Sequence, residues 1–323
     1  MLNIAVVGLG RWGQTILTAV QGKSDRLHVV HGVSKEPELA QPLARSYGFR
    51  MSTDLQDALT DPGVQAVLLA TPHSLHVEQI RMAASAGKPV WCEKPLALTR
   101  AEAARAIAAT QAAGVPLATG NNKRCFASMR ELARIVRSGE LGEILHIEGH
   151  FSNEHSTRVA GGWRDDPAES PGGGMTGAGL HILDAFVNLG GPLRSVHART
   201  VTKKPPPDPR DAVAGLVEFK SGATGLFATV RAAPMFWRVH VFGTTGSAEA
   251  RGENELIVTK IGGATEHRSF EQVDSLRVLL ERFADAVEGK APFPVTPSQM
   301  LDVISAFEAA LTSMLEGRSV AVA

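Results

Sequence analysis

The sequence predicts an α/β protein of two domains, a doubly wound parallel sheet followed by an α+β domain on a large, mostly antiparallel open sheet. Three observations support this prediction. A glycine-rich turn follows the first apolar run, strand and helix patterns then alternate strictly to about residue 119, and beyond residue 121 strand patterns follow one another directly. Alternating units build parallel sheets with right-handed crossovers, whereas consecutive strands build antiparallel sheets. With 323 residues, the chain is expected to divide into domains 1–120 and 121–323.

The chain begins with the pattern of a nucleotide-binding turn. An apolar run at 4–7 leads into Gly8-Leu9-Gly10-Arg11-Trp12-Gly13, and 14–20 has a helical pattern. In such a turn the first glycine allows a tight bend, the second admits a pyrophosphate to the backbone, and the third lets the helix pack on the strand. The helix N-terminus offers free N–H groups and a positive dipole end to the phosphates. We therefore predict a Rossmann dinucleotide site here, with Arg11 and Trp12 among its contacts.

The loop after the second strand bears on the choice of cofactor. The usual NAD site carries an acid about 20 residues past the glycines, which binds the ribose 2′-hydroxyl. Here the strand at 27–33 is followed by Ser34, Lys35, Glu36 and Pro37. A hydroxyl and a cation suit a 2′-phosphate, which favours NADP over NAD. Glu36 could reverse this preference, although Pro37 suggests that Glu36 only starts the next helix, and an ordinary solvated loop is equally compatible.

The carboxyl ends of the predicted parallel strands carry polar residues. In the first domain, strands are predicted at 4–7, 27–33, 49–51, 64–70, 89–92 and 115–119, and helices at 14–20, 38–47, 54–59, 77–86 and 100–113. Ligands of such sheets bind beyond the carboxyl ends of the strands. These ends are followed by Gly8–Gly13, Ser34, Thr71–His76, Glu93–Pro95 and Asn121–Arg124. All of them are therefore expected at one edge of the sheet.

Two of these segments carry side chains that are candidates for chemistry. Lys94 is a candidate proton acceptor, because a neighbouring cationic nicotinamide and partial burial would lower its pKa. The alternative is a surface lysine in an ion pair with Glu93. His73 and His76 are spaced as metal ligands can be, but no third ligand stands near them in the sequence. Hydrogen bonding at a helix start is favoured for both histidines, and no metal site is predicted.

The second domain is predicted to be richer in strands. Strands are expected at 144–151, 195–202, 212–219, 224–230, 239–242 and 255–261, and helices at 128–138, 273–288 and 297–316. The last helix is a candidate to pack back on the first domain. The run 205–209 is expected to be a loop, because strand patterns continue on both sides of it.

A glycine-rich run in the second domain leads to a candidate acid or base. Residues 171–179 are expected to form a flexible approach to a helix that ends near residue 189. On this helix Asp184 shares a face with His181 and could set its tautomer and orientation. A satisfied core histidine is the alternative reading of His181. The glycines, the carboxylate and the upstream Trp163-Arg164 pair support the functional one.

Composition limits the possible partners. Lys+Arg and Asp+Glu both number 33, so net charge does not favour nucleic acid or an anionic membrane. Cys92 and Cys125 have no disulfide or metal-ligand spacing and are expected to be buried thiols. The sequence shows no leader pattern and no apolar run of about 18 residues. We therefore expect a soluble cytoplasmic protein whose partner is a small molecule.

Taken together, these motifs resemble the glucose–fructose oxidoreductase and inositol dehydrogenase family (Gfo/Idh/MocA) over nearly the full chain. The matching pieces are Gly8–Gly13, Thr71–His76, Glu93-Lys94-Pro95, Trp163-Arg164 and the glycine-rich run to His181 with Asp184. The resemblance implies an NAD(P)-dependent oxidoreductase acting on sugars, polyols or related carbonyl compounds. It also implies a homodimer or homotetramer formed through the second-domain sheet.

The resemblance further implies roles for single residues. Lys94 would contact both nicotinamide and substrate, and the Lys94–Pro95 peptide bond is expected to be cis. His181 would be the acid or base at the reacting oxygen. The substrate pocket would include Trp163, Arg164 and Asp184. Further dinucleotide contacts are expected from Ala70, Thr71, Pro72, His73, His76, Glu93 and Arg124.

One position departs from the family pattern. Many members carry an Asp four residues before the histidine, where this chain has Gly177. Either Lys94 and His181 suffice for proton transfer, or the protein is a sensor or regulatory subunit that binds a dinucleotide without turnover. An NAD-dependent glycoside hydrolase, a chemistry that also occurs in the family, is a third possibility. Asp184 cannot be assumed to replace the missing carboxylate.

Overall fold

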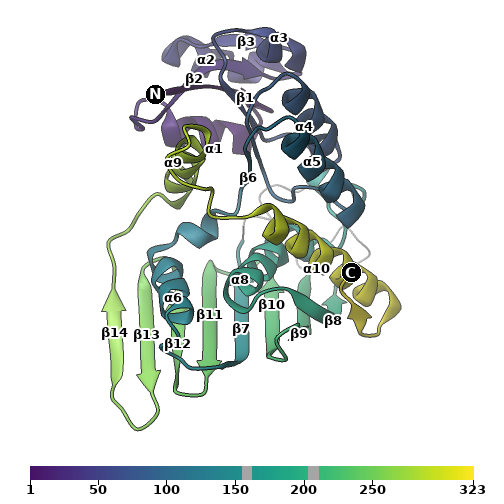
Figure 1. Ribbon diagram of the computed structural model, residues 1–323. Coiled ribbons are helices and arrows are strands. Elements are labelled where there is room, and N and C mark those ends of the chain that lie inside the picture. Colours follow the sequence, from purple (N-terminus) through teal and green to yellow (C-terminus); the bar gives the residue numbers. More distant parts are fainter. Residues whose placement is uncertain (155–161, 203–210) are drawn as a thin grey trace. The chain divides into compact units, whose positions relative to one another are not determined.

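The computed structural model describes residues 1–154, 162–202 and 211–323 of the chain. The chain divides into two compact units, residues 1–122 with 274–300 and residues 123–273 with 301–323 (Figure 1). The predicted loop at 205–209 lies outside the described residues. Residues 274–300, which the sequence analysis assigned to the second domain, belong to the first unit.

A six-stranded parallel sheet organises the first unit, all of it within the described residues. The strand order is β3-β2-β1-β4-β5-β6, and every neighbouring pair is parallel. The strands are β1 (Leu2–Val7), β2 (Leu27–Val33), β3 (Arg50–Ser52), β4 (Ala66–Leu69), β5 (Val90–Cys92) and β6 (Leu117–Thr119). All residues of β4 are buried, as expected for a strand covered on both faces. The predicted doubly wound sheet is confirmed.

Helices connect these strands. They are α1 (Arg11–Val20), α2 (Pro37–Tyr47), α3 (Leu55–Thr60), α4 (His76–Ser85) and α5 (Arg100–Ala112), with short 3-10 turns η1 (His73–Leu75) and η2 (Asn122–Cys125). A later helix, α9 (Ser275–Val287), packs against α1. Arg26 forms ion pairs of 2.6 Å with Asp285 and 2.7 Å with Glu288. These contacts, more than 250 residues apart in sequence, hold the segment in the first unit.

The second unit contains an open sheet. Its nine described strands are ordered β14-β13-β12-β11-β7-β10-β9-β8-β15. They are β7 (Ile144–Ser152), β8 (Leu193–Val201), β9 (Ala212–Phe219), β10 (Thr224–Val230), β11 (Phe236–Gly243), β12 (Gly246–Arg251), β13 (Glu255–Lys260), β14 (Thr265–Ser269) and β15 (Val320–Ala321). Among these described strands, β7 and β10 pair in parallel and the other neighbours are antiparallel. The predicted mostly antiparallel sheet is confirmed.

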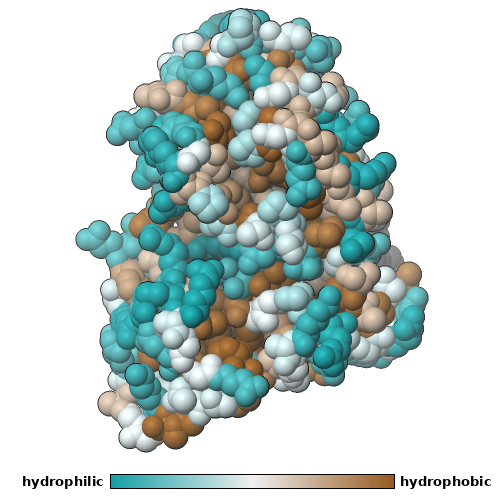
Figure 2. All heavy atoms as spheres, viewed as in Figure 1, coloured by the Kyte–Doolittle hydropathy of each residue, from teal (hydrophilic) through white to brown (hydrophobic). Residues whose placement is uncertain are grey.

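Helices cover one face of this sheet. In Figure 1, α6 (Ala127–Arg137), α8 (Leu180–Gly190) and most of α10 (Pro297–Glu316) lie over it. A Cβ on Gly149 of β7 would lie 2.5 Å from Ile182, so a glycine is required where α8 meets the sheet. Figure 2 shows hydrophilic side chains on the outer surfaces of these helices and hydrophobic residues between them. Residues 301–316 of α10 belong to this unit and residues 297–300 at its start to the first one, and the packing of this helix on the first domain stays a prediction.

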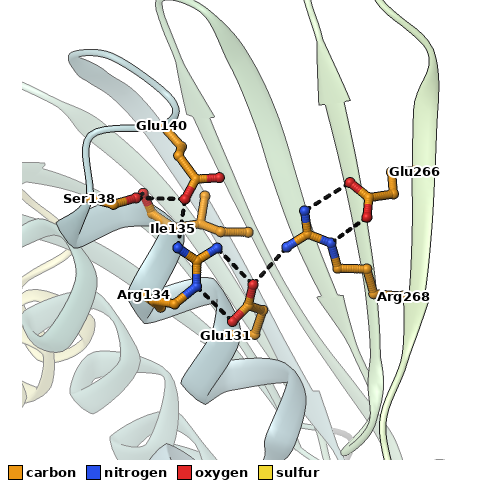
Figure 3. Close-up of polar contacts among 7 residues, drawn as sticks. All are labelled: Glu131, Arg134, Ile135, Ser138, Glu140, Glu266 and Arg268. Carbon is orange, nitrogen blue, oxygen red and sulfur yellow. Dashed lines mark hydrogen bonds and ion pairs between the residues drawn. The ribbon is translucent and has the colours of Figure 1, made fainter.

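An ion-pair network ties the edge strand β14 to the covering helix α6 (Figure 3). Arg268 of β14 contacts Glu131 of α6 at 2.6 Å and Glu266 of its own strand at 2.7 Å. Arg134 donates to Glu131 at 2.8 Å and to Glu140 at 2.7 Å. These pairs secure a strand whose own residues are all polar.

None of the helices in the described ranges is long and apolar enough to cross a bilayer.

Candidate functional site

The glycine-rich turn joins β1 to α1 at the point where the strand order of the first sheet reverses. Gly8 has a φ of +88°, and a Cβ there would lie 2.7 Å from the carbonyl oxygen of Ala70. A Cβ on Gly13 would lie 2.0 Å from the carbonyl oxygen of Gly8, so Gly13 permits the close approach of helix and strand. A Cβ on Gly10, in contrast, would meet nothing within 4 Å.

The open space at Gly10 lies where α1 begins. Gly10 is the N-cap residue, and no side chain caps the helix. The first N–H groups of α1 are thus left for an anion, in the strongest part of the helix dipole field. In steric and electrostatic terms, these residues fit the pyrophosphate of a dinucleotide.

The loop after β2 is ordered by its own hydrogen bond. The backbone N–H of Glu36 donates to the hydroxyl of Ser34 over 3.2 Å, and Lys35 is exposed. Glu36 is the N-cap residue of α2 and Pro37 its first residue, which confirms that Glu36 starts the next helix. A hydroxyl and an exposed ammonium therefore lie together beyond the carboxyl end of β2.

His76 braces the loops after β4 and β5. Its ring is fully buried, with Nδ1 2.8 Å from the carbonyl oxygen of Pro95 and Nε2 3.1 Å from that of Thr71. Because carbonyl oxygens only accept hydrogen bonds, both contacts are hydrogen bonds at once only when the ring carries two protons. The ring of His73 packs edge-on, 5.6 Å from that of His76. Among the described residues no three His, Cys, Asp or Glu side chains gather as a metal site.

Lys94 follows β5 and is half-buried. The Lys94–Pro95 peptide bond is cis, as expected. The backbone N–H of Lys94 donates to the buried carboxylate of Glu93 over 3.2 Å. A Cβ on Gly120 would lie 2.6 Å from the same carboxylate, so the start of the segment after β6 must be a glycine for Glu93 to fit. Glu93 thus supports the backbone from which Lys94 extends.

In the second unit, the glycine-rich run is held by packing. The N–H of Gly174 donates to Asp211 over 2.9 Å, and Arg231 pairs with Asp211 at 2.6 Å. A Cβ on Gly173 would lie 2.3 Å from Asp211. The expectation of a flexible approach is therefore wrong, since these glycines allow close contact with an ion pair. Gly177 differs, because a Cβ there would meet nothing within 4 Å.

His181 lies in the first turn of α8, directly after a π-helical turn over Met175–Gly179. It is 8% exposed, and its ring packs edge-on against Phe151 with 5.4 Å between the ring centroids. The sequence analysis expects the carboxylate of Asp184 to orient this ring, but the structure shows that it does not. It accepts hydrogen bonds from Arg124 instead, at 3.0 Å from Nε and 2.7 Å from Nη2. A guanidinium can donate two charge-assisted hydrogen bonds to one carboxylate, whereas the imidazole of His181, one helical turn away, cannot.

The Arg124–Asp184 pair joins two residues that the sequence analysis assigned to different ligands. Both side chains are buried. The structure shows that they bind each other inside the second unit, and their assignments to cofactor and substrate stay predictions. Trp163 and Arg164 form a separate pair, in which the guanidinium carbon lies 4.1 Å from the indole centroid. Their assignment to the substrate pocket likewise stays a prediction.

Lys123 is a charged residue that the sequence analysis did not single out. Its Nζ lies 4.4 Å from the ring centroid of Phe126 and 5.0 Å from that of Phe151. Burial lowers the pKa of Lys123 to about 8, against the opposing charge of Glu253. The available signal was its position in the segment 121–124, just beyond the carboxyl end of β6.

The first sheet and its glycine turn define a dinucleotide-binding Rossmann protein, here joined to a unit with an open, mainly antiparallel sheet. The chain belongs to the Gfo/Idh/MocA family of oxidoreductases. Residues 2–121 match the model of the oxidoreductase family with an NAD-binding Rossmann fold, and residues 129–249 match the model of the family's C-terminal domain.

Three known proteins illustrate this membership. The scyllo-inositol 2-dehydrogenase (NAD(+)) of Bacillus subtilis is 30% identical over 312 residues, 90% of this chain and 88% of the relative. An uncharacterized oxidoreductase of Schizosaccharomyces pombe is 34% identical over 148 residues, 46% of this chain but only 40% of the relative's length. A crystal structure from Desulfitobacterium hafniense, of a protein provisionally named an NADPH-dependent oxidoreductase, is 26% identical with a TM-score of 0.89. It matches over 99% of this chain and 97% of that one.

Proposed function

We propose that the protein is an NAD(P)-dependent oxidoreductase that transfers a hydride between nicotinamide and a carbinol or carbonyl carbon. The substrate class proposed is a sugar, a polyol or a related small molecule. The glycine turn carries the proposal, because Gly8 and Gly13 have no room for a side chain whereas Gly10 faces open space at an uncapped helix start. The name of the Bacillus subtilis relative, a dehydrogenase of a polyol, supports the substrate class.

The residues of this chain bind the dinucleotide, orient the reacting groups and transfer the proton. A dinucleotide, when bound, supplies the carbon that accepts or donates the hydride. The N–H groups at the start of α1 hold its pyrophosphate, and Lys94 and His181 hold and transfer the proton of the reacting hydroxyl. His76 and Glu93 keep the Lys94 backbone in place, and Phe151 supports the ring of His181.

Turnover measurements test this proposal. Purified protein should reduce NAD+ or NADP+ with some member of a panel of sugars and polyols that includes scyllo-inositol. Lys94→Ala should lower turnover by about 10²- to 10⁴-fold, the usual contribution of acid–base catalysis, and leave dinucleotide binding nearly unchanged. Lys23→Ala, at an exposed position of the same unit, is the matched control.

Two outcomes would contradict the proposal in different ways. Full turnover in both Lys94→Ala and His181→Ala would refute the assignment of proton transfer to these two residues. Tight dinucleotide binding without turnover on any panel member would instead favour the non-catalytic sensor that Gly177 suggested.

For the cofactor we propose a preference for NADP. The hydroxyl of Ser34 and the exposed ammonium of Lys35 support it, because both suit a 2′-phosphate and neither repels one. Titration of the protein with both dinucleotides, repeated with Lys35→Ala, checks the preference. A strong preference of the unaltered protein for NAD+ would overturn it.

We further propose a homodimer or homotetramer formed through the uncovered face of the second sheet. Leu216, Leu226 and Phe236 on this face are 47%, 47% and 45% exposed. Arg238 lies among them and pairs with Glu148 at 2.7 Å. Mixed charges around exposed apolar residues suit a surface that faces its own copy. Light scattering should show an oligomer that Leu226→Arg dissociates, and a monomeric unaltered protein would contradict this.

A cytoplasmic location is also proposed. Cys92 and Cys125 are both buried and neither forms a disulfide, in keeping with a compartment that maintains thiols in reduced form. Cell fractionation with an antibody against the protein would test this, and recovery outside the cytoplasmic fraction would refute it.

A further inference from the structure

Lys123 is held in a cluster of aromatic rings at one end of the second sheet. Its ammonium lies over the rings of Phe126, which precedes α6, and Phe151, at the end of β7. Both rings pack edge-on against Trp237 of β11, each with 5.7 Å between centroids. Trp237 is nearly fully buried, so these contacts place the ammonium beside a dry, electron-rich surface.

The same cluster contacts the proposed acid or base. The ring of Phe151 contacts the ammonium of Lys123 and also the ring of His181. The angle between the Phe151 and His181 rings is 81°. Lys123, Phe151 and His181 all belong to the second unit. The ammonium of Lys123 and the ring of His181 are therefore both in contact with the same aromatic side chain near the end of β7.

Within the part of the chain that the structure describes, no carboxylate is paired with the ammonium of Lys123. Arg124, its neighbour in sequence, pairs with Asp184 at 2.7 Å. Among residues 1–154, 162–202 and 211–323, no carboxylate lies within ion-pair distance of the Lys123 ammonium, and Glu253 acts on it only at longer range. A partly buried cation in this setting is stabilised by any anion that binds beside it.

We propose that Lys123 binds a carboxylate of the substrate, so that the enzyme prefers acidic sugars and polyols, such as uronic and aldonic acids, over neutral ones. The inference rests on the proposed function, because it takes His181 as the residue at the reacting oxygen. The aromatic surroundings strengthen the charge-assisted hydrogen bond by excluding water. Gly177, one helical turn before His181, presents no side chain that would repel such a substrate.

Calorimetric titration of the dinucleotide-bound protein tests the inference with matched pairs of probes. The pairs are D-glucuronate and D-glucose, D-galacturonate and D-galactose, and D-gluconate and D-glucitol. At least one acid should bind about tenfold or more tightly than its neutral counterpart, the usual gain from a hydrogen bond to a charged group. Lys123→Met should abolish the difference, whereas Lys123→Arg should keep most of it. Lys220→Met, at an exposed position of the same unit, should change nothing.

The pH dependence provides a readout that a purely structural role would not affect. Among the described residues, the titratable and charged groups near Lys123 are Glu253, whose charge acts on it, His181, which contacts the same Phe151 ring, and Arg124, which pairs with Asp184. Lys123 carries its charge below a pKa of about 8, so the preference for acids should decline as the pH rises through that value. In Lys123→Arg the preference should persist over the same range, because a guanidinium stays charged.

The outcomes separate this inference from the proposed function. If no acid binds more tightly than its neutral counterpart, or if the preference survives in Lys123→Met, the inference is overturned. If Lys123→Met does not fold, as judged by circular dichroism, the comparison of Lys123→Arg with the unaltered protein across pH decides the question. Efficient turnover of neutral polyols without any preference for acids would refute the role of Lys123 and leave the dehydrogenase intact. A preference for acids without turnover would support the role of Lys123 and refute the dehydrogenase.

Discussion

The two units carry different kinds of functional groups. In the first unit the groups that shape the dinucleotide turn and the loops after β4 and β5 belong largely to the backbone: the glycine turn, the uncapped start of α1, and the carbonyl oxygens of Thr71 and Pro95 that hold His76. In the second unit they are buried side chains, namely the Arg124–Asp184 pair and the rings around Lys123. A backbone site depends on the absence of side chains, whereas a side-chain site depends on partners brought together from distant segments.

Because of this difference, we expect substitutions to have different effects on binding and stability in the two units. In the first unit, binding and folding should be separable, because one glycine faces open space and its neighbours are tightly packed. In the second unit, the side chains near His181 also stabilise the fold, so loss of a partner should first be felt as loss of stability.

The largest effect is expected for Asp184→Ala. It leaves the guanidinium of Arg124 buried without its counter-charge, which should reduce the free energy of unfolding by about 3–5 kcal/mol. Urea denaturation measures this change. The double variant Arg124→Leu/Asp184→Leu should recover much of the loss, because an apolar pair leaves no buried charge. A loss below about 1 kcal/mol in the single variant would show that water reaches the pair.

An intermediate effect is expected for Gly13→Ala. The added methyl group would meet the carbonyl oxygen of Gly8 and should destabilise the fold by about 1–3 kcal/mol, as measured by thermal unfolding. Gly10→Ala is the matched control, because its methyl group enters open space. It should leave stability nearly unchanged and weaken dinucleotide binding in a fluorescence titration. If Gly10→Ala destabilised the protein as much as Gly13→Ala, the division of roles among the glycines would be refuted.

The smallest effect is expected for Arg268→Ala, on the partly exposed network that joins β14 to α6. The loss should be at most about 1 kcal/mol at neutral pH. Hydrogen bonds from Arg134 and the charges of Arg134 and Arg268 hold the pKa of Glu131 below its ordinary value of 4.5. A lowered carboxylate pKa stabilises the fold above the ordinary value, and the benefit disappears as the pH falls through the lowered one. The difference between variant and unaltered protein should therefore shrink in urea unfolding as the pH falls below 4.5 and through the lowered pKa of Glu131, and an undiminished difference in strong acid would contradict this account.

Strand prediction succeeded for several apolar strands of seven or eight residues and failed for strands that are very short, polar or built from small residues. β2, β9 and β10 begin and end at the residues predicted from the sequence. β12, β14 and β15 were missed. β12 consists largely of small residues and β14 of polar ones, and both are held in the sheet by their neighbours. The helix α9 was predicted from the sequence, but it was assigned to the wrong domain. The contacts of Arg26 with Asp285 and Glu288, which hold it in the first unit, cannot be predicted from local periodicity.

The sequence by itself determined the parallel sheet, the glycine turn, the cis Lys94–Pro95 bond expected from the family resemblance, and membership of the family. These features reside in short runs of consecutive residues, where backbone conformation follows from the residue types. Only the tertiary structure decided that Asp184 pairs with Arg124 rather than with His181, and that the ammonium of Lys123 lies over Phe126 and Phe151. Arg124 and Asp184 are 60 residues apart, and a buried charge takes its partner from whichever segment the fold brings nearest.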